Sequence, residues 1–131
     1  MTASTKPEIV QTGPLMAYAA DQLKARFTVH ELWKAADRAA LLREVSGRVR
    51  GVAAGGGHNR VDGALFDALP KLEVISSFGV GYDHVDAAEA GKRGLVVTNT
   101  PDVLTDEVAD LALGLLIATV RQLPQVDRYL R

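Results

Sequence analysis

The sequence predicts an α/β fold built on a five-stranded parallel sheet, and three observations support this prediction. Short apolar runs alternate with stretches of helical character at intervals of about 20 residues. The runs Gly51-Val52-Ala53-Ala54 and Val74-Ile75 do not alternate with polar residues, which is typical of strands covered on both faces. Polar or glycine residues punctuate the helical stretches where a helix should begin or end.

The predicted elements follow one another in strict alternation along the chain. The strands are expected at residues 8–11, 27–32, 49–54, 72–77 and 95–98. The helices between them are expected at 15–25, 35–45, 62–69 and 86–92. Five parallel strands with helices on both faces form a flavodoxin-like sheet, in which ligands bind beyond the carboxyl ends of the strands.

Individual residues at the helix ends agree with this assignment. Asp62 and Asp86 precede helical stretches and can act as N-caps, because a carboxylate accepts a hydrogen bond from the first-turn amides. Gly91 and Gly94 lie where the helix at 86–92 should stop before the last strand.

A further helix is predicted after the sheet and differs from the others. Pro101 ends the fifth strand region, and Thr105 then offers a capping hydroxyl with two acidic residues after it. Residues 108–120 are apolar nearly all round, so this helix needs cover from a second domain or a partner subunit, or else is an ordinary core helix. Pro124 should end or kink it. We therefore divide the chain into residues 1–100 and 101–131.

Composition excludes several classes of protein. The 131 residues include 15 basic and 16 acidic side chains, so the formal net charge is -1 and bulk charge does not favour binding to nucleic acid or an anionic membrane. The absence of cysteine excludes disulfides, thiolate zinc sites and a cysteine nucleophile. Residues 1–7 are polar, and the longest apolar run, 111–120, is half of what crosses a bilayer. A cytoplasmic protein is expected.

Three loops follow predicted strands at the ligand-binding edge, at residues 55–60, 76–83 and 99–102. Neither glycine-rich loop completes the G-x-G-x-x-G dinucleotide fingerprint, since the third glycine is replaced by Arg60 in one and His84 in the other. Glycines there serve turn geometry in the simplest interpretation. Alternatively, the backbone N–H groups of Val80 and Gly81 form a concave site that holds a small carboxylate.

No convincing acid–base pair or metal-ligand spacing appears among the titratable residues. His30 lies inside a predicted strand, which favours a structural role. His58 adjoins the first glycine loop, where it is either solvated or faces a ligand. His84 precedes a helix and is expected to orient that turn, and Asp83 and Asp86 beside it are more typical of a capping cluster than of a metal site.

The stretches G-V-G-Y-D-H-V-D at 79–86 and R-G-L-V-V-T-N-T-P-D-V-L-T-D-E-V-A-D at 93–110 resemble the substrate-domain signature of D-isomer-specific 2-hydroxyacid dehydrogenases. The resemblance covers roughly residues 8–131, and the sequence is particularly similar to the glyoxylate/hydroxypyruvate reductase branch. It implies a two-domain reductase that transfers hydride from NADP or NAD to a 2-oxoacid. Residues 1–100 would be its substrate domain, and 101–131 would be a linker and crossing helix toward a Rossmann domain.

The same resemblance implies roles for a few residues of this chain. Val80 and Gly81 match the backbone clamp for the substrate carboxylate, and Gly56 matches the glycine loop on the other side of the substrate. Thr105 matches a position near the nicotinamide of the cofactor. The helix at 105–123 would take part in a homodimer interface. The family's catalytic Arg, Glu and His lie downstream, so no catalytic residue is assigned here and the isolated chain is expected to be inactive.

Two other functions stay open at this point. One is a non-enzymatic scaffold, similar to a corepressor of the same fold. The other is a receiver or flavodoxin-type module, but a receiver needs acidic residues after its first strand and an aspartate after its third. Gln11-Thr12-Gly13 and Gly55-Gly56-Gly57 occupy those positions instead.

Overall fold

A computed structural model of the chain describes residues 6–55 and 59–131. The chain divides into two compact units, Met1–Pro101 and Asp102–Arg131. This division falls beside the boundary expected from Pro101. Each unit is described by itself below.

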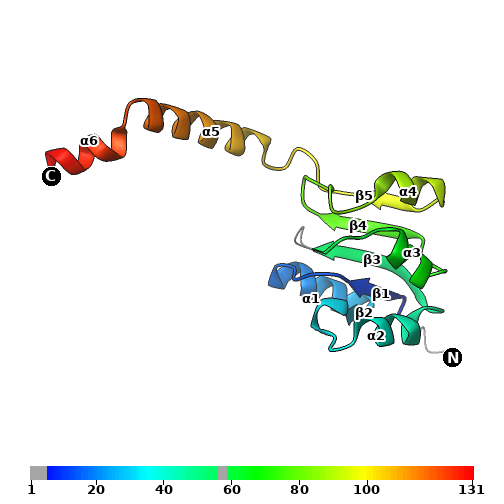
Figure 1. Ribbon diagram of the computed structural model, residues 1–131. Coiled ribbons are helices and arrows are strands. Elements are labelled where there is room, and N and C mark those ends of the chain that lie inside the picture. The colour runs from blue at the N-terminus through cyan, green and yellow to red at the C-terminus, as the bar shows by residue number, and fades with distance from the viewer. Residues whose placement is uncertain (1–5, 56–58) are drawn as a thin grey trace. The chain divides into compact units, whose positions relative to one another are not determined.

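The first unit is a five-stranded sheet in the order β2-β1-β3-β4-β5, and every neighbouring pair of strands is parallel (Figure 1). The strands are β1 (Glu8–Gln11), β2 (Thr28–Glu31), β3 (Val49–Gly55), β4 (Val74–Phe78) and β5 (Val96–Thr98). The helices are α1 (Ala17–Arg26), the 3-10 turn η1 (Leu32–Lys34), α2 (Arg38–Val45), α3 (Gly63–Ala68) and α4 (Ala87–Lys92). The predicted flavodoxin-like fold class is confirmed.

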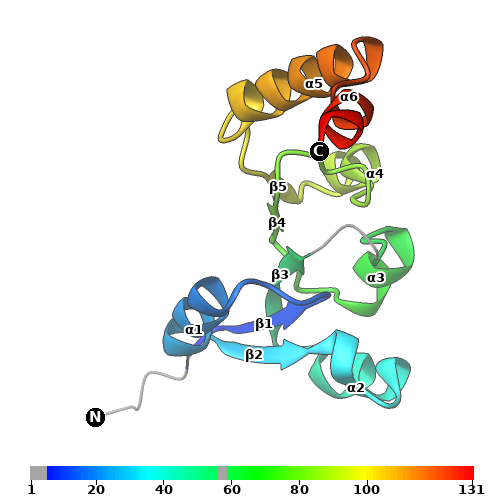
Figure 2. The same cartoon turned by 90° about the vertical axis from the view of Figure 1, so that its left-hand side faces the viewer.

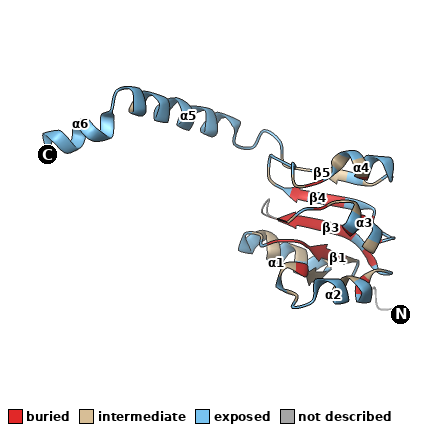
Figure 3. Ribbon diagram, in the orientation of Figure 1, coloured by how far each residue is buried: buried red, intermediate tan, exposed pale blue. Residues whose placement is uncertain are grey.

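The helices form two layers on the sheet, with α1 on one face and α2, α3 and α4 on the other (Figure 2). The main core lies under the three-helix layer, where Val10, Val52 and Ile75 pack beneath Leu65 and Phe66 (Figure 3). Burying a side chain of this size stabilises the fold by about 1.5–3 kcal/mol. This packing fixes the sheet on which the loops at its carboxyl edge are mounted.

The opposite face of β4 and β5 is open, which corrects one prediction. In β4, Ile75 and Ser77 are buried, whereas Val74 and Phe78 are exposed on the other side. Val96 of β5 is exposed as well. The run Val74-Ile75 was expected to mark a strand covered on both faces, and this is wrong. Two successive strand residues point to opposite faces, and here only the face that carries Ile75 is covered. In β3 the prediction is confirmed, since all residues but Arg50 are buried.

The predicted N-caps of the sheet unit are confirmed, but the one at Thr105 is wrong. Oδ1 of Asp62 accepts from the Ala64 N–H at 3.2 Å, and Oδ1 of Asp86 accepts from the Glu89 N–H at 2.9 Å. Helix α5 (Thr105–Val120) has Leu104 at its N-cap and no side-chain cap. Thr105 is already the first helical residue, so its hydroxyl lies past the position from which a cap accepts the orphan amides.

The second unit consists of α5 and α6 (Leu123–Leu130). Neither helix has a buried residue, and apolar side chains such as Leu111, Leu115 and Val120 are exposed along α5. The helical conformation is interrupted at Gln122, whose φ of 52° is left-handed. Pro124 lies in the first turn of α6. The break thus precedes the proline, which needs no amide partner in a first turn. No described helix is long and apolar enough to cross a membrane.

An ion cluster at the edge of the sheet joins β1, β2 and the turn that precedes β3. Nε2 of His30 lies 2.8 Å from Oε2 of Glu8, and Nε of Arg48 donates to Oε1 of Glu8 at 2.8 Å. These contacts agree with the structural role predicted for His30. The hydrogen bond with His30, followed by that from Arg48, lowers the pKa of Glu8 below its ordinary value of 4.5.

Glu8→Gln should destabilise the fold at neutral pH by on the order of 1 kcal/mol, because it removes a charge-assisted hydrogen bond. A lowered carboxyl pKa stabilises the folded state above the unfolded value and loses this effect as the pH falls through the folded value. The difference from the parent chain should therefore shrink below pH 4.5 in urea unfolding. Glu44→Gln, at a side chain with no ion pair in the described part of the chain, should show little difference. An equal pH profile for both variants would contradict this role of Glu8.

Candidate functional site

The loops at the carboxyl edge of the sheet converge because all five strands are parallel. The arrowheads of β3 and β4 in Figure 1 point to this edge. The chain leaves β1 toward α1 on one face and β3 toward α3 on the other, so the strand order reverses between these two strands (Figure 2). Such a switch point is where open α/β sheets bind ligands.

The loops after β1 and β3 touch through their backbones. A Cβ on Gly13 would overlap the carbonyl oxygen of Gly55, and a Cβ on Gly55 would lie 2.7 Å from the carbonyl oxygen of Pro14. The Asn59 side chain closes the same junction, since its Nδ2 donates to the Thr12 carbonyl at 2.6 Å. Glycine is required here for close approach. Gly56 and His58, both named above as candidates, lie outside the described residues.

The loop after β4 carries the predicted carboxylate clamp. Gly79 has a φ of 154°, which side chains rarely adopt, and it turns the chain out of the strand. The Gly79 carbonyl accepts from the Thr100 N–H at 3.0 Å, and the Val80 carbonyl accepts from Nδ2 of Asn99 at 2.8 Å. The loop is therefore held from the β5 side at two successive carbonyls.

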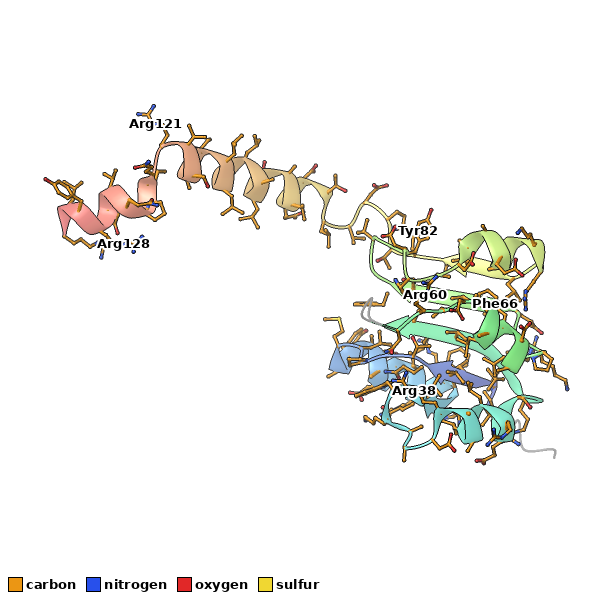
Figure 4. All side chains as sticks on the ribbon, in the orientation of Figure 1. Arg38, Arg60, Phe66, Tyr82, Arg121 and Arg128 are labelled. Atoms are coloured by element: carbon orange, nitrogen blue, oxygen red, sulfur yellow. The ribbon has the colours of Figure 1, made fainter. Side chains whose placement is uncertain are left out.

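The amides of Val80 and Gly81 are available to a ligand. Neither donates a hydrogen bond to another residue in the described ranges, and both residues are exposed. The carboxylate site expected from the sequence requires two adjacent free N–H groups, and that site stays a prediction. Asp83 is the charged neighbour, with Oδ2 at 3.4 Å from the Cβ that Gly81 lacks. Tyr82, labelled in Figure 4, marks this loop at the edge of the sheet.

His84 anchors the far end of the same loop. Its Nε2 lies 3.3 Å from Oγ of the buried Ser77, and its carbonyl accepts from the Val61 N–H at 2.9 Å. These contacts agree with the turn-orienting role predicted for it. No cluster of three metal-ligating side chains occurs in residues 6–55 and 59–131.

Two residues at this site had no role in the sequence interpretation. The sequence places Asn99 and Thr100 in a loop after the fifth strand, but it does not predict their hydrogen bonds to the loop after β4. The signal that points to them is the pairing of β4 with β5, which brings the two loops together. Thr105 begins α5 in the second unit, so its predicted place near a cofactor stays a prediction.

Comparison with known proteins decides the family. The family model described as D-isomer specific 2-hydroxyacid dehydrogenase, catalytic domain, matches residues 9–126, which is most of the chain. The chain belongs to this family. The resemblance seen in the sequence is thereby confirmed, and the parallel sheet is that of the 2-hydroxyacid dehydrogenases.

Individual members of the dehydrogenase family match nearly the whole chain. Glyoxylate/hydroxypyruvate reductase A of Arabidopsis thaliana is 41% identical over 118 residues, which are 90% of this chain and 37% of the relative. The solved 2-hydroxyacid dehydrogenase of Ketogulonicigenium vulgare is 48% identical, with a TM-score of 0.87 over 97% of this chain and 40% of that one.

A third member was solved with small molecules bound. The NADPH-dependent glyoxylate/hydroxypyruvate reductase of Sinorhizobium meliloti, in complex with NADP and malonate, is 43% identical with a TM-score of 0.78. The match covers 97% of this chain and 38% of that one. This chain thus spans well under half the length of the dehydrogenases it matches.

Proposed function

We propose that this chain is the substrate-binding part of an NAD(P)-dependent oxidoreductase that reduces 2-oxoacids, such as glyoxylate or hydroxypyruvate, to D-2-hydroxyacids. The observation that carries the proposal is the pair of free amides at Val80 and Gly81, held at the carboxyl edge of the sheet. Family membership and reductase relatives named for these substrates support it. The clamp orients the acid so that its carbonyl carbon is presented for reduction.

The chain's own residues supply binding and orientation. Two N–H groups hold a carboxylate without an arginine, because charge-assisted hydrogen bonds are about twice as strong as neutral ones. In this proposal residues 1–100 form the substrate domain, with Gly56 on the far side of the substrate. Residues 101–131 form the linker and the helix that crosses toward the cofactor domain.

The residues of this chain do not form a dinucleotide site by themselves. The sequence has no complete G-x-G-x-x-G fingerprint, and only Thr105 is proposed to approach the cofactor. NADP or NAD, which supplies the hydride, is therefore bound mainly by residues outside this chain. The NADPH dependence of the Sinorhizobium meliloti reductase favours NADP.

Residues 105–123, which contain helix α5, are the proposed homodimer contact. Its exposed Leu111, Leu113, Leu116 and Ile117 lie on several sides of one helix. An apolar surface of this kind needs a protein partner to leave water. The cytoplasmic location inferred from composition stays a prediction.

A chimera tests the proposed activity. We expect the isolated chain to oxidise no NADPH with glyoxylate or hydroxypyruvate. A chimera in which this chain replaces the matching segment of the Sinorhizobium meliloti reductase should do so. A folded chimera that binds NADPH but turns over neither acid would contradict the proposal. Turnover by the isolated chain would contradict it too, and would return attention to His58 and His84.

A further inference from the structure

We propose that Asn99 is a positioning residue for the carboxylate clamp: by holding the Val80 carbonyl, it aims the Gly81 N–H at the substrate. This inference rests on the proposed function, because it concerns the same loop. In this inference the Asn99 side chain acts through the peptide group between Val80 and Gly81 and does not itself touch the substrate.

The geometry of the peptide group carries the inference. The Val80 carbonyl and the Gly81 N–H belong to one peptide group, and no described peptide bond is cis. In a trans peptide the C=O and the N–H point in opposite directions. Nδ2 of Asn99 holds the Val80 oxygen at 2.8 Å. The Gly81 N–H must therefore point away from the β5 loop.

The preceding peptide group is held in the same way. The Gly79 carbonyl accepts from the Thr100 N–H at 3.0 Å, so the Val80 N–H also points away from the β5 loop. Two consecutive residues of one loop thus orient two consecutive peptide groups of another. Thr100 acts through its backbone, which a substitution leaves in place, whereas Asn99 acts through a side chain that can be removed.

Two physical effects follow for the clamp. A loop with glycine at 79 and 81 has a wide choice of backbone conformations, and holding its carbonyls limits the ordering cost of binding. A hydrogen bond accepted at the carbonyl also polarises the peptide group, which makes its N–H a better donor. The Asn99 residue is half-buried, although its hydrogen bond to the carbonyl of the exposed Val80 is reached by water.

The test compares the parent chain with Asn99→Ala and Asn99→Leu, the second of which keeps the volume but has no donor. Sodium oxalate is the probe, and binding is followed by NMR at the Val80 and Gly81 amides. We expect the Kd for oxalate to rise about five- to tenfold and the Val80 carbonyl carbon resonance to move. The midpoint of thermal unfolding should fall by no more than about 5 °C.

Ser46→Ala is the matched control, because it removes a side chain-to-backbone hydrogen bond, from Oγ to the Arg43 carbonyl at 3.1 Å, away from the loop. It should leave the Kd for oxalate unchanged. A measurement without any variant uses the Asn99 side-chain amide of the parent chain. By linkage, oxalate bound at the Gly81 N–H should slow the exchange of the Asn99 side-chain protons with solvent.

The outcomes separate this inference from the proposed function. Variants that bind oxalate as tightly as the parent, or Asn99 protons whose exchange ignores oxalate, would overturn the positioning role while the clamp stands. A parent chain whose Val80 and Gly81 amides do not respond to oxalate would instead overturn the clamp, and the positioning role with it.

Discussion

Gly13→Ala should destabilise the sheet unit by about 2–4 kcal/mol, the largest stability loss expected from a single methyl group here. The new Cβ would overlap the carbonyl oxygen of Gly55, which is backbone and cannot rotate away. The loop after β1 is also tied to β3 itself by the hydrogen bond from the Thr12 N–H to the Ala53 carbonyl at 3.1 Å. The steric clash can therefore be relieved only if β1 and β3 move apart at the switch point.

Urea unfolding of Gly13→Ala beside Gly47→Ala measures this effect. A Cβ on Gly47 meets nothing within 4 Å, and its φ is not in the positive region. That control should be neutral or more stable by about 0.4–1 kcal/mol, because alanine restricts the unfolded chain. If both variants unfold at the same urea concentration, the loops do not approach each other as closely as described.

Gly81→Val should raise the KM for glyoxylate about 10- to 100-fold in the chimera and leave the KM for NADPH little changed. Gly81 does not need a positive φ, so the backbone tolerates a side chain. Branched methyl groups beside the free N–H would instead exclude the carboxylate and weaken a charge-assisted hydrogen bond of about 1.5–3 kcal/mol. The measurement is the initial rate against glyoxylate at saturating NADPH.

The control for Gly81→Val is Gly91→Val, which adds the same side chain in α4, where a Cβ meets nothing within 4 Å. It should keep the KM of the parent chimera. An unchanged glyoxylate KM in Gly81→Val would show that Gly81 serves only the turn. Equal increases in the KM of both substrates would point to a general distortion of the protein.

The sheet was predictable because several independent signals coincide on it. The apolar run at 8–11 predicts β1 with the bounds that the structure has. Asp62 and Asp86 each cap the helix predicted after them. Local hydrogen bonds of this kind depend on residues two or three positions apart, so a sequence shows them directly. The position of Val80 and Gly81 after β4 follows from the same pattern.

The features that escaped prediction depend on contacts distant in sequence or on exact helix boundaries. The bond from Asn99 to the Val80 carbonyl joins residues 19 positions apart, and only the pairing of β4 with β5 brings them together. The Thr105 cap failed because the helix begins one residue earlier than a capping hydroxyl requires. The helical conformation ends at Gln122 because its backbone is left-handed, and no residue type near Pro124 predicts that conformation.

The most direct measurement is an NMR titration of the isolated parent chain with sodium oxalate, read at every assigned amide. We expect the Val80 and Gly81 resonances to shift in a saturable way with a Kd on the order of 1–10 mM, while sodium chloride at equal ionic strength leaves them in place. Shifts at these two amides no larger than the average over the chain would contradict a carboxylate site in the loop after β4.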